Sequence, residues 1–224
     1  MVKICVSGSK GKMGERIITL AKDDSGLEVS GAFDMGDDAS SAVEGCDCLI
    51  EFTSPEATME HLALCAKLKK AIVIGTTGIS VADQAKIKEA SKDIPVVFSP
   101  NMSIGVNVLF KIVKEAARAL GSEYNIEIIE AHHVHKKDAP SGTAKELDRV
   151  IKEVKGDIRI PIESVREDEI VGEHTVTFDS PLDILEITHS AKTRDIFAKG
   201  ALTAAKFLSG KKSGLYSMKD VLGL

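Results

Sequence analysis

Groups that can transfer protons or bind anions are concentrated in the segment Glu127–Ala144, which reads EIIEAHHVHKKDAPSGTA. Alternating apolar and polar residues at its beginning predict a β-strand, and Pro140 followed by Ser141, Gly142 and Thr143 predicts the start of a helix. Histidine and lysine side chains can donate or accept protons, and the first amides of a helix can bind a carboxylate or a phosphate. The segment therefore indicates a functional site.

The helix after Pro140 has a recognisable pattern. Thr143 and Glu146 have the T-x-x-E spacing of a capping box, and apolar residues recur at helical spacing until Gly156, a predicted stop. Gly142 has no Cβ that would keep a ligand from the first amides. An ordinary capped helix without a ligand accounts for this pattern taken alone. The residues that favour a binding site instead precede the helix: His132, His133, His135 and Lys136.

The N-terminal segment has the order strand, glycine turn, helix, strand and acid. Lys3–Ser7 is a predicted buried strand, the glycine turn GSKGKMG spans 8–14, and the strand Leu27–Phe33 ends at Asp34. In dinucleotide-binding folds the glycines let the backbone approach the pyrophosphate, and the acid accepts hydrogen bonds from the ribose. The glycine spacing is G-x-x-G-x-x-G, not G-x-G-x-x-G, so a glycine-rich turn without a ligand stays open as an alternative.

Strands and helices continue to alternate as far as Pro100, which predicts a parallel sheet with right-handed crossovers. Ligands on such sheets bind beyond the carboxyl ends of the strands. Six residues fall at those predicted ends: Gly8, Asp34, Thr53, Thr76, Thr77 and Asn101.

The pattern changes after Pro100. A long helix is followed by four strand-like runs with one helix among them, which is typical of an α+β domain. An alanine-rich helix at Thr193–Leu208 is expected to pack back on the first domain, so that the crevice between the domains would act as a hinge. We predict an α/β protein: a Rossmann-like parallel-sheet dinucleotide-binding domain (1–102 with 195–224) and a second α+β domain on a mixed four-stranded sheet (103–194).

Composition excludes several classes of protein. The net charge is −5 over 224 residues and no dense basic stripe occurs, which argues against nucleic-acid binding. No apolar run reaches membrane-spanning length, and the chain enters a strand at once without a signal segment, so we expect a cytoplasmic protein without a membrane partner. Cys46 and Cys48 have neither zinc-site nor redox spacing. His132 and His133 would point to opposite faces of a strand, so no metal site is predicted.

A nicotinamide beside a histidine, a lysine and an anion-binding helix start would suit the reduction of an unsaturated, carboxylated substrate. Hydride transfer to carbon leaves electron density that a positioned acid must protonate. The run E-I-x-E-x-H-x-x-x-K-x-D-x-P-S-G-T-A resembles the signature of 4-hydroxy-tetrahydrodipicolinate reductase (dihydrodipicolinate reductase), of the diaminopimelate route to lysine. The resemblance extends over nearly the whole chain, through GSKGKMG, EFTSPE, GTTG, SPNMSIGVN and LSGKKSGLYSMKDVL.

This resemblance implies roles for individual residues. His132 matches the proton donor or acceptor, and Lys136 matches a lysine that donates a proton or holds the negative charge of the substrate. The matches around the substrate carboxylates are His133, Ser141, Gly142 and Thr143. The matches that line an NADH or NADPH cofactor are Gly8, Ser9, Lys10, Gly11, Lys12, Met13, Asp34, Gly75, Thr76, Thr77, Ser99, Pro100, Asn101 and Met102. The family also implies a dicarboxylate substrate and a homotetramer joined through the second-domain sheets.

The chain departs from the family at Met35, where many members have a basic residue after the ribose acid. A 2′-phosphate thereby loses one partner, although Lys10 and Lys12 still supply positive charge, so we expect both cofactors to work with NADH favoured. Glu51 replaces a common aspartate, with little expected effect. His61, on a predicted helix without polar companions, is interpreted as a surface residue. Two alternatives stay open: another nicotinamide oxidoreductase, such as an amino-acid dehydrogenase, and a nucleotide-sensing protein without turnover.

Overall fold

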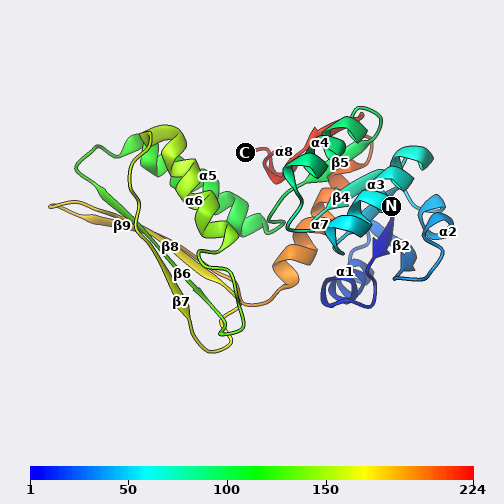
Figure 1. Cartoon of the computed structure of the whole chain (residues 1–224), viewed down its shortest axis with the longest axis horizontal. Helices are drawn as coiled ribbons and strands as arrows, with labels where there is room; N and C mark the ends of the chain where they lie inside the picture. Colours follow the sequence, from blue (N-terminus) through cyan, green and yellow to red (C-terminus); the bar gives the residue numbers. More distant parts are fainter. The chain divides into compact units, whose positions relative to one another are not determined.

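The computed structural model describes all 224 residues, which form two compact units. One unit comprises residues 1–104 and 195–224, and the other comprises residues 105–194. In the colours of Figure 1, the first unit is therefore built from blue to green segments together with the orange and red end of the chain. The second unit is an insertion between two parts of the first.

The first unit is built on a six-stranded sheet in which every neighbouring pair is parallel. The strand order is β10-β5-β4-β3-β1-β2. This arrangement confirms the predicted Rossmann-like domain. The strands are β1 (Val2–Ser7), β2 (Leu27–Phe33), β3 (Cys48–Glu51), β4 (Ala71–Ile74), β5 (Pro95–Phe98) and β10 (Gly214–Tyr216).

Helices cover both faces of this sheet, because its central strands are apolar on both sides. Successive residues of β1 alternate between two cores: Ile4 packs with α1, α7 and α8, whereas Cys5 packs with α2, α3 and α4. The helices are α1 (Lys12–Lys22), α2 (Ala39–Glu44), α3 (Pro55–Leu68), α4 (Val81–Ala90), α7 (Asp195–Leu208) and α8 (Met218–Leu222).

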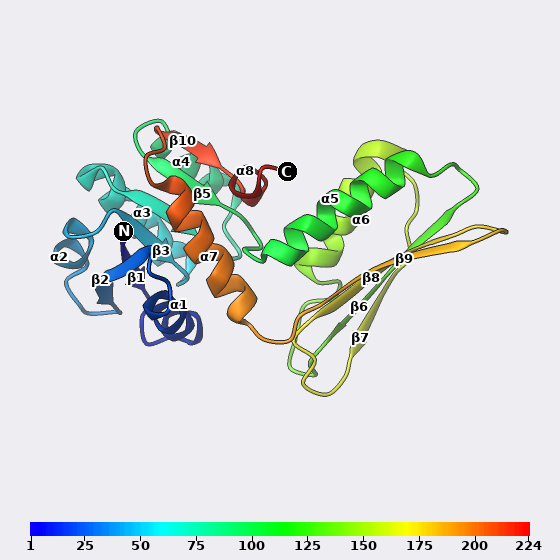
Figure 2. The ribbon, with the colours of Figure 1, turned by 180° about the vertical axis from the view of Figure 1, so that it is seen from behind.

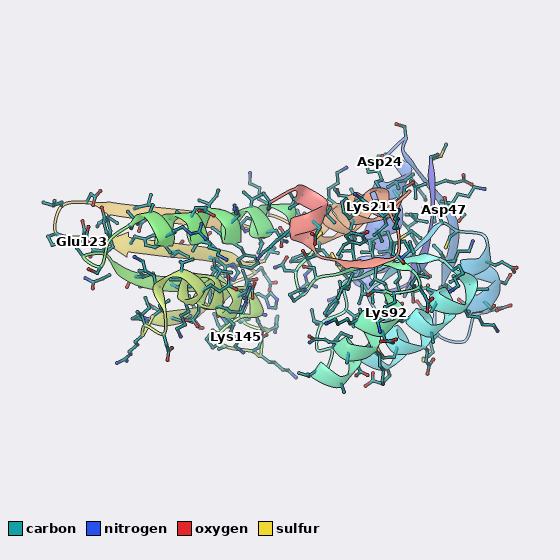
Figure 3. All side chains as sticks on the ribbon, turned by 90° about the horizontal axis from the view of Figure 1, so that it is seen from above. Asp24, Asp47, Lys92, Glu123, Lys145 and Lys211 are labelled. Carbon is teal, nitrogen blue, oxygen red and sulfur yellow. The ribbon has the colours of Figure 1, made fainter.

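Small residues allow α7 to pack closely against the rest of the first unit. A Cβ on Gly200 would lie 1.7 Å from the carbonyl oxygen of Met102, so only glycine fits there. Lys206 on the same helix donates to Asp24, in the turn between α1 and β2, at 2.7 Å. Asp24 is labelled in Figure 3. The alanine-rich sequence of this helix therefore reflects close backbone contact.

Three elements of the first unit were not predicted from the sequence: α2, β10 and α8. The three residues of β10 lie in the polar, glycine-containing run KKSGLYS, and the strand exists because its backbone pairs with Pro95–Val97 of β5. Such pairing depends on tertiary context, which short-range periodicity does not report. The other two are single short helices of six and five residues.

The second unit consists of a four-stranded sheet and two helices that cover one of its faces (Figure 2). In the order β7-β6-β8-β9, β6 and β7 run parallel while β8 runs antiparallel to both β6 and β9, which confirms the predicted mixed sheet. Its elements are α5 (Ile104–Ala119), β6 (Asn125–His132), α6 (Gly142–Lys155), β7 (Ile162–Arg166), β8 (Glu173–Asp179) and β9 (Ile184–Ser190).

Alternation along β6 determines what lies beneath the helices. Ile126 and Ile128 are buried in the apolar core, and Glu130 and His132 continue the same buried face toward the carboxyl end of the strand. The core of this unit therefore changes from apolar to ionisable along one strand. None of the helices of the protein combines the length and apolar character needed to cross a membrane.

Candidate functional site

In the first unit, the residues predicted to line a cofactor follow four parallel strands of one sheet. The glycine turn follows β1, Asp34 follows β2, Gly75–Thr77 follow β4, and Ser99–Met102 follow β5. Adjacent loops are joined by backbone hydrogen bonds, from Ser9 N to Phe33 O at 3.2 Å and from Ser99 N to Ile74 O at 3.4 Å. The structure therefore brings these segments together at the carboxyl ends of the parallel strands.

The glycine turn has the close backbone packing that a pyrophosphate site requires. Gly8 has φ +66°, and a Cβ there would lie 2.9 Å from Cγ2 of Thr53. A Cβ on Gly14 would lie 2.2 Å from the carbonyl oxygen of Gly8, so the turn and helix α1 touch directly. Gly11 is the N-cap and has no side chain to cap the first amides of α1. The helix start is thus suited to an anionic group of a dinucleotide.

Asp34 lies against this turn. Its Oδ2 accepts from the amide of Lys10 at 2.9 Å, and its Oδ1 accepts from the amide of Met35 at 2.8 Å. These two backbone donors lower the pKa of the Asp34 carboxyl, so it is ionised and can accept hydrogen bonds from a ribose. The Met35 side chain is 98% exposed and offers no charge nearby.

The structure also contains a buried polar cluster at the ends of β1 and β3, which the sequence did not indicate. Glu51, at the end of β3, is fully buried, and its carboxylate contacts His61 Nδ1 at 2.6 Å and the Thr53 amide at 3.0 Å. Ser7 Oγ lies 3.3 Å from the same His61 nitrogen. The interpretation of His61 as a surface residue without polar companions is therefore wrong, because α3 turns His61 toward the sheet.

In the second unit, a fully buried carboxylate, that of Glu130, lies at the centre of the candidate site. Arg166 donates to both of its oxygens, at 2.8 Å to Oε1 and 3.0 Å to Oε2. The amide of Ser141 donates to Oε1 at 3.2 Å, and Nδ1 of His132 contacts Oε2. Burial alone would raise the pKa of Glu130, but hydrogen bonds from Arg166, Ser164 and His132 hold that pKa at about 2.

His132 is the imidazole that this carboxylate contacts. Its ring is nearly buried, and burial lowers the pKa of His132 below the ordinary value although Glu130 acts in the opposite direction. A Cβ on Gly172 would lie 3.0 Å from Nε2, so a glycine lies against that edge of the ring. His174 packs edge-on against the ring with centroids 5.1 Å apart.

Lys136, the second predicted catalytic residue, is held by the loop that follows β6. Its ammonium group lies 2.8 Å from Oδ1 of Asp138, and this lysine lowers the pKa of Asp138. His133 follows His132 directly and its ring lies 6.2 Å from that of His135. The loop thus supplies an ammonium group and two further imidazoles.

Helix α6 begins beside the carboxylate of Glu130. Ser141 is its N-cap, with Oγ accepting from the amide of Ala144 at 3.1 Å. The capping box predicted at Thr143 and Glu146 is therefore wrong, because the helix starts two residues earlier and Glu146 pairs with Arg149. Nothing lies within 4 Å of a Cβ placed on Gly142, so the first turn is open. Ser141 Oγ also contacts Nε2 of His174 at 2.9 Å.

Ligand atoms of Glu130, His132 and His174 lie within 4.8 Å of one another, a spacing that a metal ion could bridge. However, both Glu130 oxygens already accept from the guanidinium of Arg166. A cation there would have to compete with a fixed positive charge, so this geometry favours a proton-transfer site over a metal centre.

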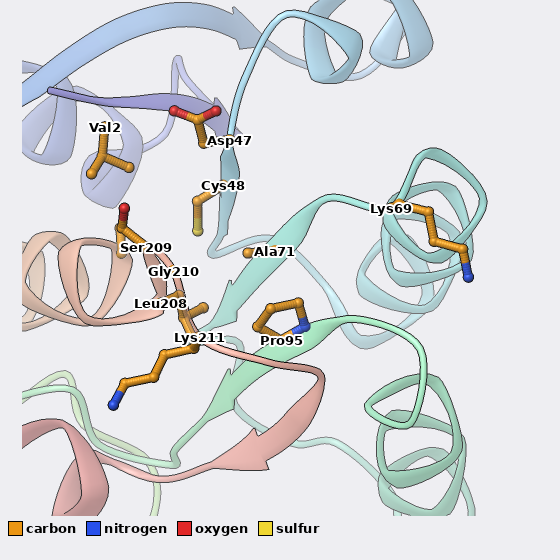
Figure 4. A pocket seen from close by; sticks show the side chains of 11 residues that line it. Val2, Asp47, Cys48, Lys69, Ala71, Pro95, Leu208, Ser209, Gly210 and Lys211 are labelled. Carbon is orange, nitrogen blue, oxygen red and sulfur yellow. The ribbon is translucent and has the colours of Figure 1, made fainter.

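A hollow of about 230 Å³ in the first unit lies at the opposite ends of the parallel strands, their amino ends (Figure 4). It is lined by the first residues of four strands, Val2, Cys48, Ala71 and Pro95. The amino groups of Lys69 and Lys211 point away from it, toward Asp93 and the ring of Phe207. None of the predicted cofactor residues lines this hollow. It lies at the amino ends of the strands, whereas nucleotides bind beyond the carboxyl ends.

The parallel sheet with its glycine turn, together with an acid-base cluster on a separate α+β unit, defines a two-domain oxidoreductase of the dinucleotide-binding class. Family models described as the N-terminus and the C-terminus of dihydrodipicolinate reductase match residues 2–102 and 105–222. The chain belongs to the dihydrodipicolinate reductase family, as the resemblance implied. It is accordingly a reductase of the diaminopimelate route to lysine.

Curated relatives agree over the full length. The chain is 43% identical to a 4-hydroxy-tetrahydrodipicolinate reductase of Geobacter metallireducens and 41% identical to one of Geotalea daltonii, over 266 positions that cover 100% of each chain. A solved structure of dipicolinate-bound dihydrodipicolinate reductase from Paenisporosarcina sp. TG-14 has a TM-score of 0.84 at 22% identity, covering 98% of each chain. This last similarity concerns the fold.

The buried imidazole of His174 makes stability depend on pH. Burial, followed by the neighbouring His132, lowers the pKa of His174 from 6.5 to about 3, so the unfolded chain binds this proton before the folded chain does. Acidification from pH 6.5 toward pH 3 therefore lowers the free energy of unfolding. We predict that His174→Gln reduces this pH dependence by up to about 1.4 kcal/mol per pH unit.

Urea unfolding followed by circular dichroism at pH 6.5, 5.5 and 4.5 measures the effect. His135→Gln, at an exposed position of the nearby loop, is the matched control and should keep the wild-type dependence. An unchanged dependence in the His174 variant would contradict the prediction.

Proposed function

We propose that the chain reduces 4-hydroxy-tetrahydrodipicolinate, through its dehydrated form, to tetrahydrodipicolinate with NADH or NADPH, and that His132 and Lys136 carry the proton chemistry. The observation that supports these roles most directly is the nearly buried His132 ring, fixed through Nδ1 by a buried carboxylate on the strand that leads into the Lys136 loop. A fixed imidazole with a second cationic acid nearby suits protonation of a carbon that has received a hydride.

A bound nicotinamide dinucleotide would supply the hydride, and the first unit has the features to hold it. The uncapped start of α1 suits the pyrophosphate, and the ionised Asp34 suits the adenosine ribose. The loops after β4 and β5 complete the proposed cofactor-binding set on the same edge, with Thr76 Oγ1 fixed by Thr58 Oγ1 at 2.9 Å. These residues bind and orient the cofactor without taking part in proton transfer.

The start of α6 is the proposed seat for a substrate carboxylate. Gly142 leaves its first turn open, and the polar groups that we assign to the carboxylate are those of Ser141, Thr143 and His133. The related protein of Paenisporosarcina was solved with dipicolinate, a diacid, which supports a dicarboxylate substrate. Two carboxylates beside His132 would stabilise its imidazolium form and offset the effect of burial on its pKa. Substrate binding would thereby prepare the proton donor.

The second-unit sheet supports the proposed homotetramer. Its helices cover the face that carries Glu130 and His174, and the opposite face carries Ile129, Thr175 and Thr188, with the two threonine hydroxyls 2.9 Å apart. A sheet face without helices of its own unit is suited to pack against a second copy. The cytoplasmic location stays a prediction from the sequence.

Replacing His132 or Lys136 with alanine tests the catalytic roles. We expect kcat to fall about 100-fold or more in each variant, because a positioned general acid typically contributes that much. The Kd of NADH, measured by fluorescence titration, should change less than threefold. His61→Ala would not be a neutral control, because His61 contacts Glu51. The control is therefore His135→Ala, which removes an exposed imidazole from the loop that carries Lys136. Full activity in both catalytic variants would refute the assignment.

Cofactor preference tests the reading of the ribose site. Met35 contributes no charge there, whereas Lys10 and Lys12 are the nearby cations in the turn, so we expect both cofactors to work with NADH favoured. Met35→Arg should raise kcat/KM for NADPH by about 10-fold through one added phosphate partner. Initial rates with both nucleotides measure this, and a tenfold preference of the wild-type protein for NADPH would overturn it.

Light scattering tests the oligomer. The wild-type chain should have about four times the protomer mass of 23.9 kDa. Thr175→Arg places a charge in the open face of the sheet and should yield smaller species, whereas Glu123→Arg, at the turn between α5 and β6 (Figure 3), should not. A monomeric wild-type protein at micromolar concentration would exclude this proposal.

A further inference from the structure

We propose that Glu130 is the positioning residue of His132: its carboxylate holds the proton on Nδ1, so that Nε2 is the nitrogen that gains and loses a proton during reduction, while Arg166 fixes the carboxylate. The proposal rests on the function proposed above for His132. It adds two residues to the reaction, neither of which touches substrate or cofactor in this role.

In the contact between Glu130 and His132, one of the two groups must carry the proton. The Glu130 carboxylate accepts from the two terminal guanidinium nitrogens of Arg166, from the amide of Ser141 and from the hydroxyl of Ser164. So many donors stabilise the ionised form, which has no proton to offer. The contact between Oε2 and Nδ1 is therefore a hydrogen bond only if Nδ1 is the donor.

The other ring nitrogen of His132, Nε2, has different surroundings. Nε2 makes no hydrogen bond within the protein, unlike Nδ1, and the residue beside it, Gly172, has no side chain. Any Cβ at position 172 would lie 3.0 Å from Nε2 and 3.3 Å from Cδ2. Position 172 thus adds no side-chain atom to the edge of the ring that carries Nε2, while Glu130 fixes the other edge.

The charges around the His132 ring act in opposite directions on its pKa. Glu130 favours the imidazolium, whereas Lys136, Arg166 and the desolvation of the site oppose it, and His174 is neutral and packs edge-on. Glu130 is thus the single group among these whose charge stabilises a proton on His132. Without it, the imidazole would have a lower proton affinity and could also rotate or adopt the other tautomer.

A purely structural role would leave different traces. Arg166 also donates to the carbonyl oxygen of Asp138 at 2.6 Å, so the Glu130–Arg166 pair joins β6, β7 and the loop that carries Lys136. If joining these segments were its only role, a folded variant would retain the wild-type tautomer and ionisation of His132. The test therefore measures the imidazole itself as well as turnover.

The kinetic test uses Glu130→Gln, which keeps the shape of the side chain and removes its charge. We expect kcat to fall about 100-fold or more with the KM for NADH within threefold, and the His132 ionisation in the pH profile of kcat/KM to move to lower pH. Glu123→Gln, at an exposed position in the turn before the same strand, is the matched control and should behave as wild type. A folded Glu130→Gln variant with kcat within twofold of wild type would overturn the proposal.

The spectroscopic test does not depend on turnover. In ¹⁵N-histidine-labelled protein at pH 7.5, with His132→Gln used to assign the signal, His132 should show a protonated Nδ1 and an unprotonated Nε2. Glu130→Asp, which keeps the charge but shortens its reach, should shift the ring toward a mixture of tautomers, and it serves if the Gln variant fails to fold. A wild-type His132 protonated on Nε2 alone would sink the proposal even in an active enzyme. Conversely, the expected tautomer in a protein that does not reduce the substrate would uphold the positioning and reject the proposed function.

Discussion

The candidate site of the second unit depends on the ion pair between the buried carboxylate of Glu130 and the guanidinium of Arg166. A buried carboxylate is tolerated only when its charge and lone pairs are matched, and removing one partner of such a pair typically costs about 3–5 kcal/mol. Here the requirement is met by groups from β7, from the start of α6 and from His132. Satisfying one charge therefore fixes the strand, the helix start and the imidazole relative to one another.

The first unit relies on backbone geometry rather than on buried charge. Its glycine turn works because Gly8 and Gly14 let β1, the turn and α1 lie closer than side chains would allow. The buried Glu51, with His61 and Thr53, supports the loop after β3, against which Gly8 packs. The two units thus rely on different interactions: close backbone packing at glycines in the first, and a matched buried charge that fixes an imidazole in the second.

Local patterns predicted the features that local physics controls. The apolar strands, the mixed sheet and the segment from Glu127 to Ala144 follow from periodicity and residue type, and the family resemblance supplied the reaction. Contacts across the sequence could not be foreseen in the same way. His61 meets Glu51 only because α3 packs on the sheet, and Arg166 reaches Glu130 from 36 residues away through strand pairing. Ser141 displaces Thr143 as the helix cap because its neighbours, the Glu130 carboxylate and His174, lie in the tertiary structure.

The insertion of the second unit into the first has a consequence for biosynthesis on the ribosome. Helix α7 fills one face of the parallel sheet, and β10 forms its edge, yet both are translated after residue 194. Residues 1–104 of the nucleotide-binding half are therefore translated before the second unit but lack part of their core until residues 195–224 follow, whereas the inserted half has all its elements earlier. Until then, the nascent chain exposes the apolar surface that α7 later covers. Exposed apolar surface favours aggregation, so the nascent chain most needs chaperones during this interval.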